Sequence, residues 1–125
     1  MKKYYAIALN WLAVLLWLGV IYYFSSQPNL KSELEPIWDL IFRKIAHLAE
    51  FFVLAYLLYR SLSSNGLKGK NLLLISFFLS LTFAVLDEWH QSQVAGRLAS
   101  PVDVLVDSVG ILFFVALQLK VKFSK

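Results

Sequence analysis

The chain has 125 residues, of which 59% are hydrophobic and 16% charged, and its formal net charge is +4. Soluble domains are typically about 45–50% apolar and about 25% charged, and a chain this small has too little interior to bury the excess. The composition therefore excludes an ordinary soluble monomer and indicates an integral membrane protein. The absence of cysteine also excludes disulfide frameworks, thiolate metal sites and cysteine nucleophiles.

The first predicted membrane span covers residues 4–24 and contains no charged side chain. At about 1.5 Å per residue it can cross a hydrocarbon core of about 30 Å. It exceeds the apolar stretch of a signal peptide, about 7–15 residues, and no small-residue cleavage pattern follows it, so we expect a retained helix. The second span is predicted over residues 36–60, with Pro36 at the first helical position.

The third span is predicted over residues 71–91 and the fourth over residues 101–119. Ser100 and Pro101 have the residue types of a helix N-cap and a first helical position, so they mark the start of the fourth span. Four helices joined by short connections predict an all-α fold, an antiparallel four-helix bundle in the membrane that forms a single domain over residues 1–125.

The charged residues are divided unevenly between the two sides of this bundle. The side with both termini holds eight basic residues: Lys2, Lys3, Arg60, Lys68, Lys70, Lys120, Lys122 and Lys125. The other side holds four, Lys31, Arg43, Lys44 and Arg97, together with all eight acidic residues. The positive-inside rule then places both termini in the cytoplasm. The basic excess is explained by topology, so we expect no nucleic-acid partner.

Polar side chains occur at a similar depth in three of the predicted spans, near the acidic side. They are His47 and Glu50 with Lys44 in the second span, Asp87, Glu88 and Gln91 in the third, and Asp103 and Asp107 in the fourth. Ionisable groups at the centre of a bilayer cost at least about 2.5–3.5 kcal/mol each, so they should face the bundle interior. We expect His47 and Glu50 to reach Asp87 or Glu88, with Asp103 and Asp107 turned toward the same cavity.

Five motifs occur in register along the chain: Phe24-Ser25-Ser26-Gln27-Pro28, Arg43-Lys44-Ile45-Ala46-His47-Leu48-Ala49-Glu50-Phe51, Asp87-Glu88-Trp89-His90-Gln91, Gly96-Arg97, and Asp103-Val104-Leu105-Val106-Asp107-Ser108-Val109-Gly110. In order and spacing the chain resembles the VanZ family of small polytopic membrane proteins. The resemblance implies a multi-pass protein of the bacterial cytoplasmic membrane, in a family whose founding member accompanies teicoplanin resistance. Ala95 stands where the family usually has a proline, which predicts a looser loop around Arg97.

Three functions remain open for the polar residues. In an enzyme acting on a lipid-linked phosphate, the catalytic groups would be His47, Glu50, Asp87 and Glu88. Lys44 and Arg97 would then hold the phosphate, and Ser25, Ser26, Gln27, Gln91, Asp103 and Asp107 would complete the substrate site. No cofactor is required by the sequence, although His47, Glu50 and the neighbouring carboxylates have the residue types that bind a divalent metal ion.

The second function is a module that binds a membrane lipid, a lipid-linked envelope precursor or an antibiotic without chemistry. The third is structural, with ion pairs such as Glu50 with Arg97 or Lys44 with Asp87 joining the helices. The serines and glutamine after Phe24 would cap the first span or present hydroxyls to the cluster. Gly110 is expected to permit close helix approach, with Gly19 as a partner.

Overall fold

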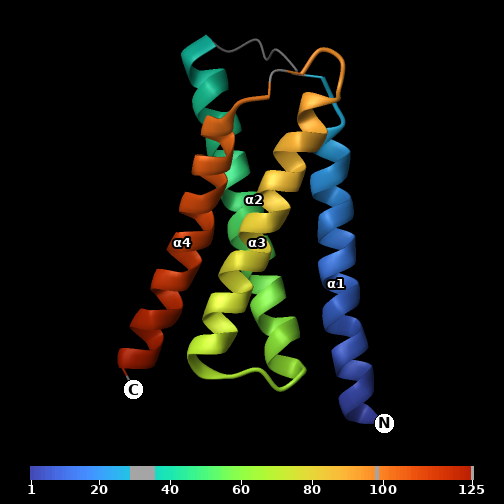
Figure 1. Ribbon diagram of the computed structural model, residues 1–125, viewed down its shortest axis with the longest axis vertical. Helices are drawn as coiled ribbons and strands as arrows, with labels where there is room; N and C mark the ends of the chain where they lie inside the picture. Colours follow the sequence, from blue (N-terminus) through green and yellow to red (C-terminus); the bar gives the residue numbers. More distant parts are fainter. Residues whose placement is uncertain (29–35, 98, 125) are drawn as a thin grey trace.

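A computed structural model of the chain describes residues 1–28, 36–97 and 99–124, and the elements in these residues are four α-helices (Figure 1). They are α1 (Lys2–Ser25), α2 (Pro36–Ser64), α3 (Gly69–Ser92) and α4 (Pro101–Phe123). The predicted all-α four-helix fold is therefore confirmed. Three of the helices, α1, α3 and α4, are long and apolar enough to cross a membrane, which makes the chain a multi-pass membrane protein.

The helix starts agree with the proline positions in the sequence. α2 begins at Pro36 and α4 at Pro101. At the start of α4 the Ser100 hydroxyl accepts a hydrogen bond from Val102 N at 3.3 Å, as expected of an N-cap. The predicted ends were too early, because α2 continues to Ser64 and α4 to Phe123. At about 1.5 Å per residue α2 is roughly 43 Å long, so it extends beyond a hydrocarbon core of about 30 Å.

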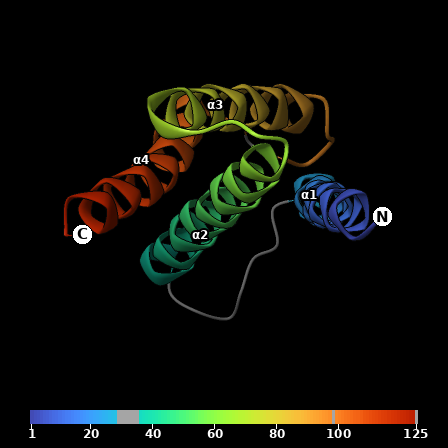
Figure 2. The same cartoon turned by 90° about the horizontal axis from the view of Figure 1, so that it is seen from below.

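Helix α2 is the centre of the bundle. It packs against α1, α3 and α4, and seen along the bundle it lies between α1 and α4 (Figure 2). Both termini and the α2–α3 connection lie at one end, whereas the α3–α4 connection lies at the other (Figure 1). Helix α3 also packs against α1 and α4 directly, so side chains of all four helices can meet near the acidic end.

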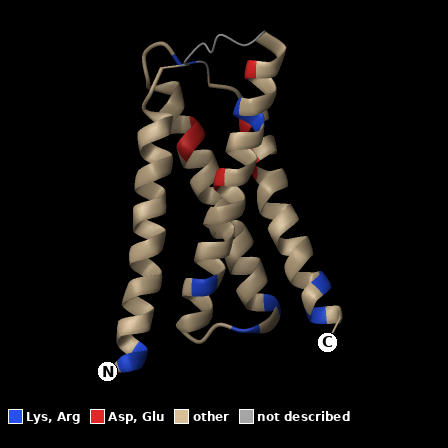
Figure 3. Ribbon diagram, turned by 180° about the vertical axis from the view of Figure 1, so that it is seen from behind, with Lys and Arg blue, Asp and Glu red and all other residues tan. Residues whose placement is uncertain are grey.

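The two ends of the bundle differ in charge (Figure 3). At the end with the termini the charged residues are all basic, namely Lys2, Lys3, Arg60, Lys68, Lys70, Lys120 and Lys122 within the described ranges; we call it the basic end. All the acidic residues that the structure describes lie toward the opposite end, which we call the acidic end. The predicted separation of charge is thus present in the folded bundle.

The buried face of α3 shows how one helical stripe changes character along the bundle. It begins with Leu72, Ser76, Ser80 and Ala84 at intervals of three or four residues, and it ends with polar side chains at the acidic end. The two serine hydroxyls donate to the carbonyls of Leu72 and Ser76 at 2.7 and 2.6 Å, so they need no partner on another helix. Small side chains leave room for α2 to pack closely.

Gly110 allows the closest approach between α2 and α4. A Cβ atom added there would lie 2.2 Å from the carbonyl oxygen of Leu48, so any side chain would force the helices apart. The expected close approach at Gly110 is therefore present, but its partner is the α2 backbone. Gly19 was the wrong partner, because a Cβ at that position meets nothing within 4 Å.

Candidate functional site

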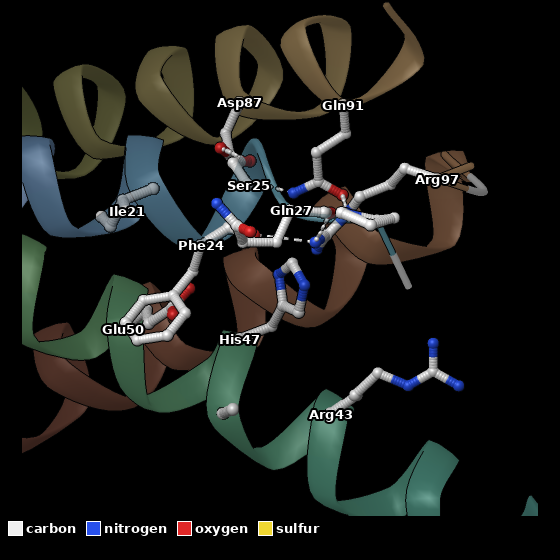
Figure 4. A pocket seen from close by; sticks show the side chains of 12 residues that line it. Ile21, Phe24, Ser25, Gln27, Arg43, His47, Glu50, Asp87, Gln91 and Arg97 are labelled. Atoms are coloured by element: carbon white, nitrogen blue, oxygen red, sulfur yellow. Dashed lines mark hydrogen bonds between the residues drawn. The ribbon is translucent and has the colours of Figure 1, made fainter. Parts of the chain in front are cut away.

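A cavity of about 400 Å³ lies between α1, α2 and α3 near the acidic end (Figure 4). In the close-up, Asp87 and Gln91 extend into it from α3, and His47 and Glu50 approach from α2 on the opposite side. Its apolar lining consists of Ile21, Phe24, Pro28 and Ala46, and its polar lining consists of Ser25, Gln27, Arg43, His47, Glu50, Asp87, Gln91 and Arg97. The cavity thus combines an apolar wall with convergent polar groups, as ligand sites do.

Asp87 is held in place by two neighbours. The Ser25 hydroxyl of α1 donates a hydrogen bond to Asp87 Oδ1, and Gln91 Nε2, one turn further along α3, donates to Asp87 Oδ2 at 2.7 Å. All three side chains are buried. Because each oxygen of Asp87 already accepts a hydrogen bond, the carboxylate has a fixed orientation.

Arg97 extends this network to the end of α1. Its Nε donates to Gln91 Oε1 at 3.2 Å, and one of its terminal nitrogens donates to the carbonyls of Phe24 and Gln27 at 2.9 and 3.0 Å. The looser loop predicted from Ala95 does not leave the arginine side chain without contacts. The described residues show no ion pair between Arg97 and Glu50, so that suggested structural pair is not present.

His47 is paired with Asp107 of α4. The His47 Nδ1 atom lies 3.1 Å from Asp107 Oδ1, within hydrogen-bonding distance. The second oxygen of Asp107 is buried and has no hydrogen-bond partner among the described residues. His47, Asp87 and Asp107 each offer one ligand-type atom, and these atoms all lie within 4.8 Å of one another. Their common depth in the sequence therefore corresponds to a real cluster, formed by three different helices.

A smaller cavity of about 230 Å³ lies beside the first, toward α4. Four residues line both cavities: Arg43, His47, Gln91 and Arg97. In the smaller cavity Lys44 forms an ion pair with Asp103 of α4, and not with Asp87 as suggested for a structural pair. Asp103 is therefore turned toward the smaller cavity, which His47 also lines.

Glu88 is not brought together with the other candidates. Its Oε1 accepts a hydrogen bond from the backbone N–H of Ser100, and it lines a separate cavity with Pro101 and Val104. Successive residues of a helix point about 100° apart, so Asp87 and Glu88 cannot both face the same neighbour. Because Asp87 continues the buried stripe of α3, Glu88 is directed to the start of α4.

The polar residues at the end of α1 serve both of the roles considered for them. Ser25 faces the cluster, whereas Ser26 donates to the Tyr22 carbonyl at 2.7 Å and Gln27 donates to the Tyr23 carbonyl at 3.3 Å. Ser26 also lies 2.9 Å from His90 Nε2. These two residues therefore cap the helix, and Gln27 in addition lines the cavity.

One residue of the cavity was missed from the sequence. Arg43 lines both cavities and forms an ion pair with Asp39 at 2.8 Å. The available signal was its spacing, because Arg43 lies four residues before His47 and so shares its helical face.

The fold and the cluster define a polytopic membrane protein whose four helices enclose a buried His/Asp site near the acidic end. The family model described as VanZ/LLP1 matches residues 10–121, so the chain belongs to the VanZ/LLP1 family. Neither the curated proteins nor the solved structures contain a match to the chain.

Proposed function

We propose that the protein binds the anionic head group of an envelope lipid or lipid-linked cell-wall precursor and acts on its phosphate by acid/base catalysis. The observation that carries the proposal is the environment of Arg97. All three hydrogen bonds of its side chain go to neutral oxygens, those of Gln91, Phe24 and Gln27. Among the described residues no carboxylate pairs with it, so its positive charge is available to an anion in the cavity.

Two further cations flank this position. Arg43 and Lys44 lie on α2 one turn nearer the acidic end than His47, and both line the smaller cavity together with Arg97. Guanidinium groups bind phosphate through parallel hydrogen bonds, and a lysine adds a point charge. Arg43 and Lys44 already have carboxylate partners, so Arg97 is the main anchor and they supply the surrounding positive field.

The acid/base groups lie deeper than the cations. Glu50 lines the large cavity, and its backbone carbonyl accepts a hydrogen bond from the Trp17 indole at 2.9 Å, which ties this turn of α2 to α1. No hydrogen bond between described residues engages the Glu50 carboxylate, in contrast to Asp87. We assign Glu50 as the principal acid/base group, with His47, oriented by Asp107, as the second.

For hydrolysis of the phosphate ester the proton balance is simple. Glu50 takes a proton from water as the water oxygen bonds to phosphorus. The bond between phosphorus and the lipid oxygen breaks, and that oxygen receives a proton from Glu50 or His47. Transfer to another acceptor follows the same steps with a hydroxyl in place of water.

The cellular side of the site follows from topology. The positive-inside rule assigns the basic end to the cytoplasm, so the acidic end faces the outside of the bacterial cytoplasmic membrane. Teicoplanin acts on peptidoglycan precursors at that face, so action on such a precursor would account for a role in glycopeptide tolerance. This role belongs to the proposal.

A structural role is favoured for one part of the polar set. The Lys44–Asp103 pair joins α2 to α4 directly, so it stabilises the bundle whatever the cavity binds. The same argument does not extend to Glu50, which lines the cavity without joining two helices through its carboxylate. The alternative of ligand binding without chemistry differs from the enzyme only at Glu50 and His47.

The test compares turnover in purified protein reconstituted with polyprenyl phosphates and diphosphates, with phosphate release as the readout. Glu50→Gln and His47→Ala should fold and extract like wild type yet lose about a hundredfold or more of the rate, the scale of acid/base contributions. Ser61→Ala is the control, a buried polar side chain of the same helix that donates to the Leu57 carbonyl and lines neither cavity. Wild-type rates in both site variants would overturn the catalytic assignment, and Arg97→Gln would then separate binding from a structural role by lipid affinity.

A further inference from the structure

We infer that His47, Asp87 and Asp107 bind a divalent cation of the first transition row, with Mn²⁺ and Zn²⁺ as the ions their donor atoms suit. The inference deepens the proposed function, on which it rests for the role of the ion. The binding of the ion itself depends on the cluster alone.

The geometry supports a single ion between three helices. The three ligand-type atoms lie within 4.8 Å of one another, one each from α2, α3 and α4. Ligand atoms at about 2.1 Å from one ion are separated by about 3–4 Å. The observed separations therefore exceed the upper end of that range for a bound ion by about 1 Å at most.

The second oxygen of Asp107 is an independent observation. The Asp107 side chain is only 1% exposed, and its Oδ2 has no hydrogen-bond partner among the described residues. A buried carboxylate oxygen without a partner is costly, and such groups call for an unseen water or ion. Since the first oxygen is taken by His47, Oδ2 is the atom that a cation would satisfy.

Charge balance points the same way. Asp87 and Asp107 are both buried, and the hydrogen bonds to Asp87 come from the neutral groups of Ser25 and Gln91. Two carboxylates within one helix bundle in a membrane need compensation. A divalent cation supplies it at the position where both side chains converge.

The surroundings of the cluster resemble the outer shell of a metal site. Ser25 and Gln91 fix the orientation of Asp87, which is how second-layer hydrogen bonds hold metal ligands (Figure 4). One imidazole and two carboxylates form a mixed nitrogen and oxygen set, which suits Mn²⁺ or Zn²⁺ better than Ca²⁺. The remaining coordination positions would face the cavity, where water and a phosphate oxygen can bind.

With the ion bound, His47 serves as a ligand, and Glu50 alone keeps the acid/base role. This division makes the two proposals separable. A Glu50→Gln variant should lose turnover and retain the ion, whereas a variant of His47 should lose both.

The experiment measures ion binding by the full-length protein in detergent micelles, without any assay of turnover. Protein stripped with a chelator is dialysed against Mn²⁺ or Zn²⁺, and the bound ion is quantified by elemental analysis together with the shift in melting temperature. We expect one ion per chain and a higher melting temperature with the ion present. Asp107→Asn and Asp87→Asn should each weaken affinity by about a hundredfold or more, and Ser25→Ala by about tenfold or more.

Asp103→Asn is the matched control, since it removes a carboxylate of the same helix that pairs with Lys44 outside the cluster. Its ion affinity should remain close to wild type. If Asp107→Asn does not fold, Asp87→Asn and His47→Gln give the same test from the other two helices.

The inference is overturned if neither ion is retained, or if a retained ion is bound equally well by the cluster variants. If chelated protein still releases phosphate from the lipid, the ion has no role in the reaction, and the proposed function stands without it. If the protein binds the ion but turns over no lipid phosphate, the proposed function is wrong and the ion site remains.

Discussion

The two halves of the bundle are built from the same four helices but have different interiors. Toward the basic end the core consists mainly of buried apolar side chains such as Leu54, Leu58 and Phe114, and the buried serines there bond to the backbone of their own helices. Toward the acidic end the buried positions of the same helices carry Asp87 and Asp107. A single helical stripe therefore serves packing along one part of its length and carries the buried polar residues along the rest.

The difference matters because lipid gives little hydrophobic drive for helix association. In the apolar half the helices are held by close packing, so stability should depend on side-chain volume. In the polar half they are held by hydrogen bonds and ion pairs, so stability should depend on partners. Substitutions in the two halves should therefore lower the stability of the bundle for different reasons.

The largest expected contrast concerns the two ends themselves. The chain has no cysteine, so a single introduced cysteine is unique. In intact cells a membrane-impermeant thiol reagent should label Ser92→Cys, at the last residue of α3, and should not label Ser124→Cys at the basic end. Labelling after membrane permeabilisation is the control for Ser124→Cys. The reverse pattern would put the cavity on the cytoplasmic face and remove the envelope hypothesis.

The apolar half is tested by shortening a fully buried side chain. Leu54→Ala, at a residue that is 0% exposed, should lower the free energy of unfolding in detergent by about 2–5 kcal/mol. Leu15→Ala on the lipid-facing side of α1, where the side chain is 63% exposed, should change it by about 0.5 kcal/mol or less. Equal effects at the two positions would show that packing does not hold this half together.

The boundary between the halves is tested at Gly110 of α4 and Gly19 of α1. Gly110→Ala should destabilise the protein by about 1–3 kcal/mol, because its Cβ would meet the Leu48 carbonyl. Gly19→Ala meets nothing within 4 Å and should be neutral or stabilise by about 0.5–1 kcal/mol, since alanine favours the helix. Thermal unfolding of the two variants is the measurement. A tolerated Gly110→Ala would mean that α2 and α4 are not tightly packed there.

The smallest expected effect is that of the Lys44–Asp103 ion pair in the polar half. Asp103 is buried, but Lys44 is partly exposed and water screens the pair, so a double-mutant cycle with Lys44→Met and Asp103→Asn should give a coupling energy of about 0.5–1 kcal/mol. The exchanged pair, Lys44→Asp with Asp103→Lys, should recover most of the loss. A coupling energy near zero would leave the ion pair without a stabilising role.

The sequence was most informative where one physical rule decided the outcome. Pro36 and Pro101 marked helix starts because proline is favoured at that position, and the uneven charges marked the two ends. The cost of charge in lipid also indicated correctly that His47, Asp87 and Asp107 would meet. These rules act locally or on the whole chain, so they do not require knowledge of the packing.

What the sequence did not reveal were the choices between neighbouring partners. Asp87 and Glu88 were treated alike, although the stripe through Ser80 and Ala84 predicts that only Asp87 faces inward. The pairing of Lys44 with Asp103 depends on how α2 and α4 rotate about their axes. How α2 and α4 rotate relative to each other is set by their packing, and the pattern along either helix alone does not determine it.

The distribution of the cluster and its Ser25 neighbour over all four helices has a consequence for biosynthesis. Ser25 leaves the ribosome 62 residues before its partner Asp87, and His47 precedes Asp107 by 60 residues. During insertion the early helices must therefore enter the bilayer with these polar groups unmatched or still near the translocation machinery. The His47, Asp87 and Asp107 cluster is complete only after the last helix has been made, because Asp107 lies on α4.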